Sequence, residues 1–410
     1  MDISKFRKDF PLLNSEDNPT YLDSACMTLR PQAVIDAITD YYTNYPACGG
    51  RSVHKLSWQV TENFEMARDQ IRRFLGAEKP TEIVFTKNAT EGMNIVANGL
   101  NLKKGDKVLT SDKEHNANVV PWHHLAKYKG IKYDVLPAKD NYFFDIEALK
   151  ETITSDTKIF SFVHSSNLDG HTNPAKEIIE ICHDKGVRVM MDAAQSAPHK
   201  EVNVVDLDVD FAAVSAHKFC GPSGMGALYG KYEELEKLIP TYVGGSTVVN
   251  STYEDYKLLP PPSCFEPGLQ DYAGAIGAGV AAAVLALSKT ILGLMDDSPG
   301  PTYALFFGLI LASVWIPFKH MKAPAFSHLA AGLLAAGFAW FFVGLQPDGI
   351  QLRVLDGQAS VHDSETSVFY GGKLRHPSDL TAIQKVRKTT FPNSKGIVVF
   401  DPKGILAANA

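Results

Sequence analysis

Four short groups of polar residues in the first half of the chain carry side chains that could do chemistry together. Asp192 directly follows the apolar run 187–191, and Lys218 follows the apolar run 211–214 in the segment Ser215-Ala216-His217-Lys218. Thr90, in Asn88-Ala89-Thr90-Glu91-Gly92, opens a helical pattern after another such run, and His115 follows the run 107–110. Taken singly, Asp192 and Thr90 fit ordinary helix caps, and Lys218 and His115 fit surface or structural positions.

The four groups together fit one cofactor, pyridoxal 5′-phosphate. That cofactor needs a lysine for covalent attachment and a carboxylate that keeps its pyridine nitrogen protonated, so that the ring can accept electrons. Lys218 and Asp192 supply these two groups. A helix that begins directly after a strand offers backbone N–H groups to a phosphate, which indicates an anion site at Thr90. The imidazole of His115 could stack on the planar ring.

The elements that must position these residues alternate along the chain. Apolar runs predict strands at 82–85, 107–109, 158–163, 187–191 and 211–214, and amphipathic stretches predict helices at 58–75, 117–129 and 174–185. Strands that are apolar on both faces and alternate with helices favour an α/β fold with a mostly parallel, doubly wound sheet. Ligands bind such sheets at the carboxyl ends of the strands, where Asp192, Lys218 and His115 are expected.

Composition excludes several other classes of protein. The 410 residues include 40 Lys and Arg and 46 Asp and Glu, a net charge of −6, so no basic footprint for nucleic acid is expected. The 5 cysteines include no C-x-x-C pair, which argues against a disulfide framework or a metal site and favours a reducing, cytoplasmic compartment. The N-terminus lacks the apolar core of a signal peptide.

The composition changes after about residue 272. The runs 272–288, 301–318 and 323–346 carry no Asp, Glu, Lys or Arg, and each approaches the roughly 20 apolar residues that span a bilayer. Three spans, a two-span hairpin after a buried 272–288 helix, and buried core helices all fit this pattern. The tail 347–410 is polar again and reads as a small α/β segment without an assigned role. We therefore expect three regions, 1–283, 284–346 and 347–410.

At this point the order of the motifs resembles a known family. Residues 1–283 are similar to class-V aminotransferases, and within them to the Suf-type cysteine desulfurases and selenocysteine lyases. A weaker match is Phe265-Glu266-Pro267-Gly268. The main matching segments, in family order, are Tyr21-Leu22-Asp23-Ser24-Ala25, Arg51-Ser52-Val53-His54-Lys55-Leu56-Ser57, Ala89-Thr90-Glu91-Gly92, Glu114-His115-Asn116-Ala117-Asn118, Ser166-Asn167-Leu168-Asp169-Gly170, Asp192-Ala193-Ala194-Gln195 and Ser215-Ala216-His217-Lys218.

The resemblance implies a fold-type-I pyridoxal-phosphate enzyme and a role for each matching position. Lys218 would hold the cofactor and move the substrate α proton, and His115 would stack on the ring and assist proton transfer. The further cofactor-binding residues would be Thr90, Asn167, Asp192, Gln195, Ser215 and His217. The substrate entrance would be lined by Ser24, Ala25, Arg51 and His54.

The family resemblance also implies a reaction and partners. L-cysteine would be converted to L-alanine, and its sulfur would be passed to an acceptor protein for iron–sulfur cluster assembly. The family forms homodimers with the active sites near the interface. Selenocysteine lyase or another class-V activity is the alternative within the family.

The sequence departs from the family after about residue 283. The C-terminal small domain of the family carries an Arg-Thr-Gly-x-x-Cys loop with the persulfide-forming cysteine, and an arginine for the substrate carboxylate; the sequence shows neither. A threonine that often follows Phe-Glu-x-Gly is Leu269 here. An impaired desulfurase, or a membrane-associated fusion without turnover, is therefore a further alternative.

The segment that replaces the small domain resembles a different family. Residues of about 285–346, including Leu287-Ser288-Lys289 and the run 301–313, resemble a fragment of a prokaryotic polytopic membrane family associated with undecaprenyl-phosphate translocation. This resemblance implies membrane association through 301–346. A fragment with so few spans is not expected to transport, because a transport site needs paired repeats around it.

Overall fold

The computed structural model describes residues 7–15, 19–50, 52–139 and 144–297, together with five short strands near the C-terminus. For 288–297 and for these strands, only the backbone is described. The chain divides into two compact units, Met1–Asp296 and Asp297–Ala410.

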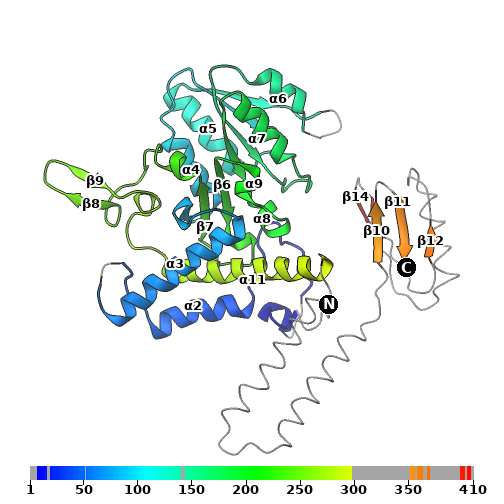
Figure 1. Ribbon diagram of the computed structural model, residues 1–410, viewed down its shortest axis with the longest axis horizontal. Coiled ribbons are helices and arrows are strands. Elements are labelled where there is room, and N and C mark those ends of the chain that lie inside the picture. Colours follow the sequence, from blue (N-terminus) through cyan, green and yellow to red (C-terminus); the bar gives the residue numbers. More distant parts are fainter. Residues whose placement is uncertain are drawn as a thin grey trace, which may run out of the picture. The chain divides into compact units, whose positions relative to one another are not determined.

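A seven-stranded sheet forms the centre of the first unit (Figure 1). Its strand order is β1-β7-β6-β5-β4-β2-β3, and all neighbours pair in parallel except β7, which is antiparallel to both β1 and β6. The mostly parallel α/β sheet predicted from the sequence is therefore confirmed. The strands are β1 (Ile83–Thr86), β2 (Lys107–Ser111), β3 (Lys132–Leu136), β4 (Thr157–Val163), β5 (Arg188–Asp192), β6 (Phe211–Ser215) and β7 (Gly226–Gly230).

Successive residues of the inner strands bury opposite faces of the sheet. Val84, Val108, Ile159 and Met190 belong to one hydrophobic cluster, which also contains side chains of α4 (Ala89–Gly99) and α5 (Asn116–Lys129). The residues next to them in each strand belong to a second cluster with α2 (Gln32–Asn44), α3 (Lys55–Leu75), α7 (Ala175–Asp184) and α11 (Tyr272–Asp297). Helices thus cover both faces, which explains why the strands are apolar throughout.

Shorter elements connect this framework. They are the helices α6 (Ile146–Thr152), α8 (Ser196–His199), α9 (Val204–Leu207) and α10 (Tyr232–Leu235), and the 3₁₀ turns η1 (Pro11–Asn14), η2 (Pro80–Glu82), η3 (Ala216–Lys218) and η4 (Ser263–Phe265). An antiparallel hairpin of β8 (Val248–Ser251) and β9 (Tyr256–Leu258) projects from the body (Figure 1).

The first uncharged run of the sequence is a core helix. Helix α11 lies alongside α2 beneath the sheet (Figure 1), and Ala275, Ala278, Ala281 and Ala282 on it are at most 1% exposed. The three-span alternative for 272–288 is therefore wrong, because this run already buries its small side chains against the rest of the unit. No helix of the described residues is long and apolar enough to cross a membrane.

A buried ion pair ties the end of the first unit to α3. The guanidinium of Arg68 donates to Glu266 at 2.7 and 3.0 Å, and Glu266 also accepts from the backbone N–H of Phe85 at 2.7 Å. The nearby carboxylates raise the pKa of Arg68 although its burial opposes this. This pair fixes the segment that leads from η4 into α11.

The described strands of the second unit form two small antiparallel sheets. One contains β10 (Gln351–Leu355), β11 (Gln358–His362) and β12 (Ser367–Phe369), and the other contains β13 (Val398–Asp401) and β14 (Gly404–Ala407). The apolar runs 301–318 and 323–346, on which the membrane prediction depends, lie outside the described residues.

Candidate active site

Asp192 lies at the carboxyl edge of the sheet, between two neighbouring strands. It ends β5, where it pairs in register with Val163 of β4 and Ala213 of β6, and it is 4% exposed. Burial raises the pKa of Asp192, while the N–H of Ala194 and the charges of Lys218 and His115 lower it. Asp192, Lys218 and His115 thus follow the strands β5, β6 and β2 of one sheet, and Asp192 lies within electrostatic reach of the other two residues.

Lys218 is presented by a tight turn after β6. The turn η3 covers Ala216–Lys218, and the backbone N–H groups of Phe219 and Gly221 both donate to the carbonyl of Ala216, at 3.0 and 2.8 Å. A Cβ on Gly221 would lie 2.8 Å from the Cβ of Ala216, so the chain can fold back here only because residue 221 has no side chain. This turn directs the chain away from the sheet directly after the lysine.

At the predicted anion site, the start of α4 is not capped by Thr90. Asn88, not Thr90, is the N-cap, because its side-chain oxygen accepts from the N–H of Glu91 at 3.0 Å. The interpretation of Thr90 as an N-cap is therefore wrong, and Thr90 is an exposed residue of the first turn. Ser215 at the end of β6 accepts from the N–H of Ala89 at 2.9 Å, which joins the lysine-bearing loop to this helix start.

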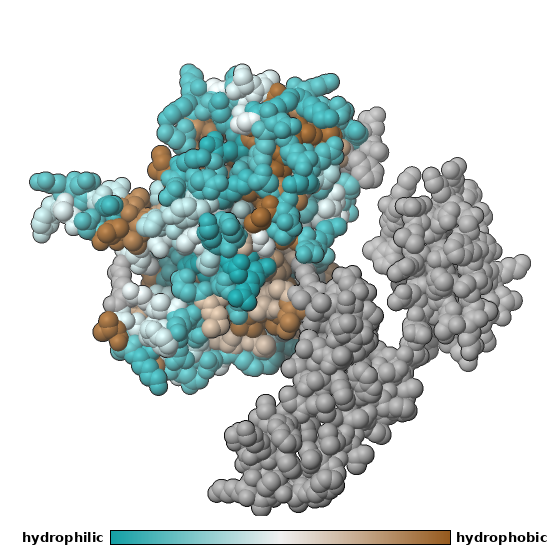
Figure 2. All heavy atoms as spheres, in the orientation of Figure 1, coloured by the Kyte–Doolittle hydropathy of each residue, from teal (hydrophilic) through white to brown (hydrophobic). Residues whose placement is uncertain are grey.

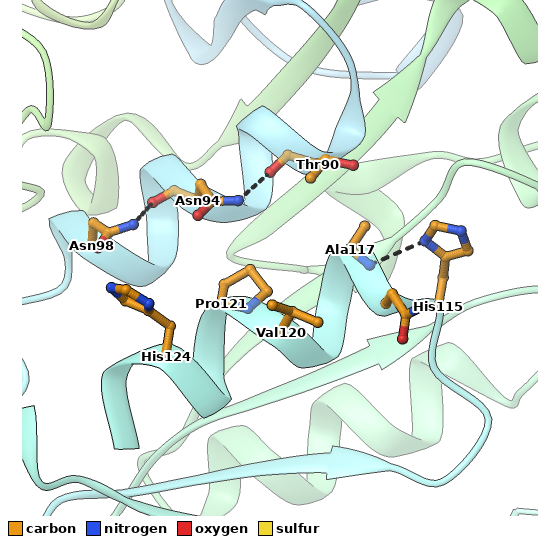
Figure 3. A pocket seen from close by; sticks show the side chains of 9 residues that line it. Thr90, Asn94, Asn98, His115, Ala117, Val120, Pro121 and His124 are labelled. Atoms are coloured by element: carbon orange, nitrogen blue, oxygen red, sulfur yellow. Dashed lines mark hydrogen bonds between the residues drawn. The ribbon is translucent and has the colours of Figure 1, made fainter. Parts of the chain in front are cut away.

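His115 caps α5 and lines an open groove next to Thr90 (Figure 3). Its Nδ1 accepts from the N–H of Ala117 at 3.1 Å, and its ring is exposed. The groove, with a volume of about 460 Å³, continues between α4 and α5 and is lined further by Asn94, Asn98, Asn116, Val120, Pro121 and His124. Figure 3 shows the residues of the two helices facing each other across it.

Asn167 lies in an exposed turn after β4 that is tied to the loop carrying His115. The N–H of Gly170 donates to Ser166 at 3.0 Å and closes this turn, and Lys113 pairs with Asp169 at 2.5 Å. The loops after β2 and β4 are thereby joined, which places Asn167 and His115 on neighbouring loops of the same sheet edge.

The segment with Ser24 and Ala25 docks onto the same edge. The side-chain amide of Gln195, a 7% exposed residue, donates to the carbonyl of Ala25 at 2.7 Å. Thr28 donates to the carbonyl of His217 from both its N–H and its hydroxyl, each at 2.9 Å. Burial, Lys218 and Arg30 together lower the pKa of His217, so this imidazole is neutral at pH 7.

The predicted entrance residue His54 caps a helix in the structure. Nδ1 of His54 caps α3 by accepting from the N–H of Ser57 at 3.3 Å, and within the described residues no hydrogen bond or ion pair links His54 to the sheet edge. Arg51 lies outside the described residues.

All 5 cysteines are free: Cys26 and Cys48 are exposed, Cys220 is half-buried, and Cys182 and Cys264 are buried. Among the described residues, no cluster of His, Cys, Asp or Glu could hold a metal.

Sequence reasoning gave no role to Glu114, which lies directly before His115. Its carboxylate accepts hydrogen bonds from the ends of two strands and from α5, and it interacts electrostatically with Asp192. Its position in the sequence could have indicated a role, because it is an acidic residue that follows an apolar strand and stands next to a candidate cofactor contact.

The groups at this edge fit pyridoxal phosphate. A buried carboxylate lies within electrostatic reach of a lysine, an exposed imidazole lies beside them, and the start of α4 offers backbone N–H groups with Thr90 and Ser215 next to it. A lysine, a ring-nitrogen partner and an anion site are the three groups that this cofactor requires. The fold and this site together define a pyridoxal-phosphate-dependent protein of fold type I.

Comparison with known proteins gives the family. The family described as "Aminotransferase class-V" matches residues 20–291, and the chain belongs to this pyridoxal-phosphate-dependent family. A second match, to the family described as "Undecaprenyl phosphate translocase-like", covers residues 270–372. Both family resemblances inferred from the sequence are confirmed by these matches.

The relatives of the first unit are named as cysteine desulfurases. A probable cysteine desulfurase of Halalkalibacterium halodurans is 41% identical over 287 residues, which cover 68% of this chain and 71% of the relative. The crystal structure of a cysteine desulfurase from Escherichia coli is 31% identical with a TM-score of 0.64, covering 78% of each chain. The apo structure of a cysteine desulfurase from Thermococcus onnurineus NA1 is 30% identical with a TM-score of 0.67, covering 94% of this chain and 86% of the other.

Proposed function

We propose that the chain is a pyridoxal-phosphate-dependent enzyme of the cysteine desulfurase type, which removes sulfur from L-cysteine and leaves L-alanine. The observation that carries this proposal is that buried Asp192 ends β5, which pairs with β6, the strand that leads into the turn carrying Lys218. When bound, the cofactor withdraws electrons from the substrate α carbon. The relatives named as cysteine desulfurases point to cysteine as the substrate, and selenocysteine is the alternative.

Each residue at the edge has a task in this proposal. Nζ of Lys218 would hold the cofactor and would carry the α proton, and Asp192 would keep the ring nitrogen protonated. The ring of His115 would lie against the cofactor and would assist the proton transfer. Gln195 and Asn167 bind the phenolic oxygen, and Thr90, Ser215 and neutral His217 bind the phosphate. Ser24, Ala25, Arg51 and His54 line the entrance.

The sulfur needs a thiol acceptor. An attacking thiolate forms a bond to the substrate sulfur as the carbon–sulfur bond breaks, so that the acceptor thiol becomes a persulfide and cysteine becomes alanine. The family's Arg-Thr-Gly-x-x-Cys loop is absent from the sequence. We therefore propose that turnover is slow and uses added or partner thiols, including those of a sulfur-acceptor protein.

The assembly that we propose is a homodimer in the cytoplasm. Exposed apolar residues gather at the base of the projecting hairpin (Figure 2); Val249 in β8 is 56% exposed and Val243 in the loop before β8 is 49% exposed. Such residues favour packing against a second copy. We further propose that residues 1–283 act as the catalytic domain, that 284–346 form an apolar helical segment able to associate with a membrane, and that 347–410 form a separate polar part.

The test is the visible absorption spectrum of the full chain with added pyridoxal phosphate. We expect a band from lysine-bound cofactor in the wild type and in Lys129→Ala, an exposed lysine at the end of α5, and no band in Lys218→Ala. Addition of L-cysteine and a small thiol should then yield alanine and sulfide. A folded wild type without the band, or a band that persists in Lys218→Ala, would contradict the proposal. Retention in carbonate-washed membranes without a band would instead support the membrane-associated alternative.

A further inference from the structure

Glu114 holds together three elements at the edge of the site. It lies between the end of β2 and the start of α5. Its Oε1 accepts from the hydroxyl of Ser111 and from the backbone N–H of Val163, the latter at 2.8 Å, and its Oε2 accepts from the side-chain amide of Asn118 at 2.7 Å. One carboxyl therefore fixes β2, β4 and α5 relative to one another.

A buried polar network continues from this carboxyl into the core. The side-chain oxygen of Asn118 accepts from the hydroxyl of Ser161 at 2.5 Å and from the indole N–H of Trp122 at 3.4 Å. Asn118, Ser161 and Trp122 are all 0% exposed. Because buried polar groups depend on their hydrogen-bond partners, this network constrains the first turn of α5 and with it the adjoining residue His115.

The electrostatic surroundings of Glu114 disfavour its negative charge. Burial and, to a smaller extent, the charge of Asp192 raise its pKa to about 8, and the three hydrogen bonds oppose this shift only in part. The titratable groups that face it are Asp192 on β5 and Tyr133 on β3, whose pKa is raised by burial and also by Glu114. Lys113, paired with Asp169, and His115 flank it in the chain.

The hydroxyl of Ser111 allows both protonation states. A serine hydroxyl can donate to a carboxylate or accept from a carboxylic acid, so the same geometry serves either form of Glu114. Protonated Glu114 leaves Asp192 as the single buried negative charge at the edge. Ionised Glu114 adds a second negative charge, which favours protons on the basic groups nearby.

We propose that Glu114 is a positioning residue that holds the loop presenting His115 and that sets the charge around Asp192 by taking up or releasing a proton within the working pH range. This role rests in part on the proposed function, because the charge of Glu114 acts on the cofactor-binding groups. Its coupling to Asp192 does not require the cofactor and can be measured without it.

The first experiment uses the full chain without added cofactor. Trp122 reports on Glu114 through Asn118, so the fluorescence of the wild type should change with a midpoint near pH 8, and this change should be absent from Glu114→Gln and from Trp122→Phe. Asp192→Asn should move the midpoint to lower pH, because it removes the nearby negative charge. A wild type without the transition, or an unchanged midpoint in Asp192→Asn, would overturn the inference.

The second experiment uses the chain loaded with pyridoxal phosphate. Below pH 7 the spectrum of Glu114→Gln should match that of the wild type, because both then carry a neutral group at 114. Above pH 8 the proton at Nζ of Lys218 should be lost at a lower pH in Glu114→Gln than in the wild type. A purely structural role would alter the spectrum equally at every pH, which would contradict the inference. If no cofactor binds at all, the proposed function fails while the fluorescence titration still decides the role of Glu114.

Discussion

His164 lies at the end of β4, directly beside the strand that carries Asp192. Its backbone N–H donates to the carbonyl of Asp192 at 2.9 Å, and its ring is buried with Nδ1 lacking a hydrogen-bond partner. Burial and, to a smaller extent, the charge of Lys200 lower the pKa of His164 to about 4. The folded edge therefore holds this imidazole in its neutral form.

This neutral histidine makes stability depend on pH. An unfolded histidine titrates near 6.5, so between pH 6.5 and about 4 the unfolded chain binds more protons at this residue than the folded chain does. Stability is consequently lost as the pH falls through this window, by up to about 3 kcal/mol. We expect His164→Asn to lose less unfolding free energy than the wild type between pH 7 and pH 4.5, as measured by urea unfolding at each pH.

The matched control for this prediction is His124→Asn. His124 is exposed on α5, so its replacement should leave the pH profile unchanged. If His164→Asn and the wild type lose the same unfolding free energy over this range, the buried ring is not responsible for the loss.

At the residue scale, the sequence predicted the residues whose position follows from the strand pattern. Asp192 and Lys218 follow apolar runs, and parallel strands bring such positions to one edge. The contacts of Glu114 with Val163, and of Thr28 with His217, join segments far apart in the chain, so no local pattern indicates them. Arg51 was predicted from the family motif alone, and it lies outside the described residues.

At the scale of elements, α11 packs against α2 and α3 through glycine. A Cβ on Gly279 would lie 2.6 Å from both Cα and Cβ of Ala67, whereas a Cβ on Gly277 would meet side-chain atoms alone, those of Ile38 from 2.9 Å and of Pro222 at 3.5 Å. Backbone atoms of a neighbouring helix cannot move aside as the end of an isoleucine can. The close approach of α11 to α3 therefore depends on Gly279.

Substituting the two glycines separates this effect from helix propensity. By helix propensity alone, alanine would be more stable than glycine by about 1 kcal/mol at either position. We nevertheless expect Gly279→Ala to destabilise the first unit by about 1–3 kcal/mol through overpacking, and Gly277→Ala to be near neutral or stabilising. The urea midpoint of the first unit, followed by far-UV circular dichroism, measures both. Equal midpoints for the two variants would show that α11 can shift away from Ala67.

The strands that the sequence did not predict lack a continuous apolar run, some because they are exposed and one because of its glycines. β3 is an edge strand whose pattern is largely exposed, and β7 is bounded by Gly226 and Gly230, so neither shows the apolar run of a central strand. The hairpin β8–β9 is mostly exposed. The predicted strands at 82–85, 107–109, 158–163, 187–191 and 211–214 are all confirmed within a few residues, because burial on both faces makes them continuously apolar.

At the scale of the whole molecule, the two family matches meet inside one helix. The first match ends at residue 291 and the second begins at 270, so both include the first part of α11. Its residues 272–282 pack largely into the core of the first unit. The relatives named as cysteine desulfurases extend beyond the match, which covers 71% of the first of them.

The proposed homodimer can be tested at the hairpin that projects from the first unit. Tyr253 is 110% and Val249 is 56% exposed. Exposure of their apolar surface to water is unfavourable in free energy, and packing against a second copy would remove this penalty. We expect light scattering to give the wild type a mass near twice the 44.8 kDa of one chain. The double variant Val249→Asp with Tyr253→Ser should have a mass closer to 44.8 kDa. Val205→Asp, on the distant short helix α9 with 49% exposure, should remain dimeric. If the hairpin variant stays at twice the mass, the copies meet through another surface, and if the wild type itself is monomeric, the site functions within one chain.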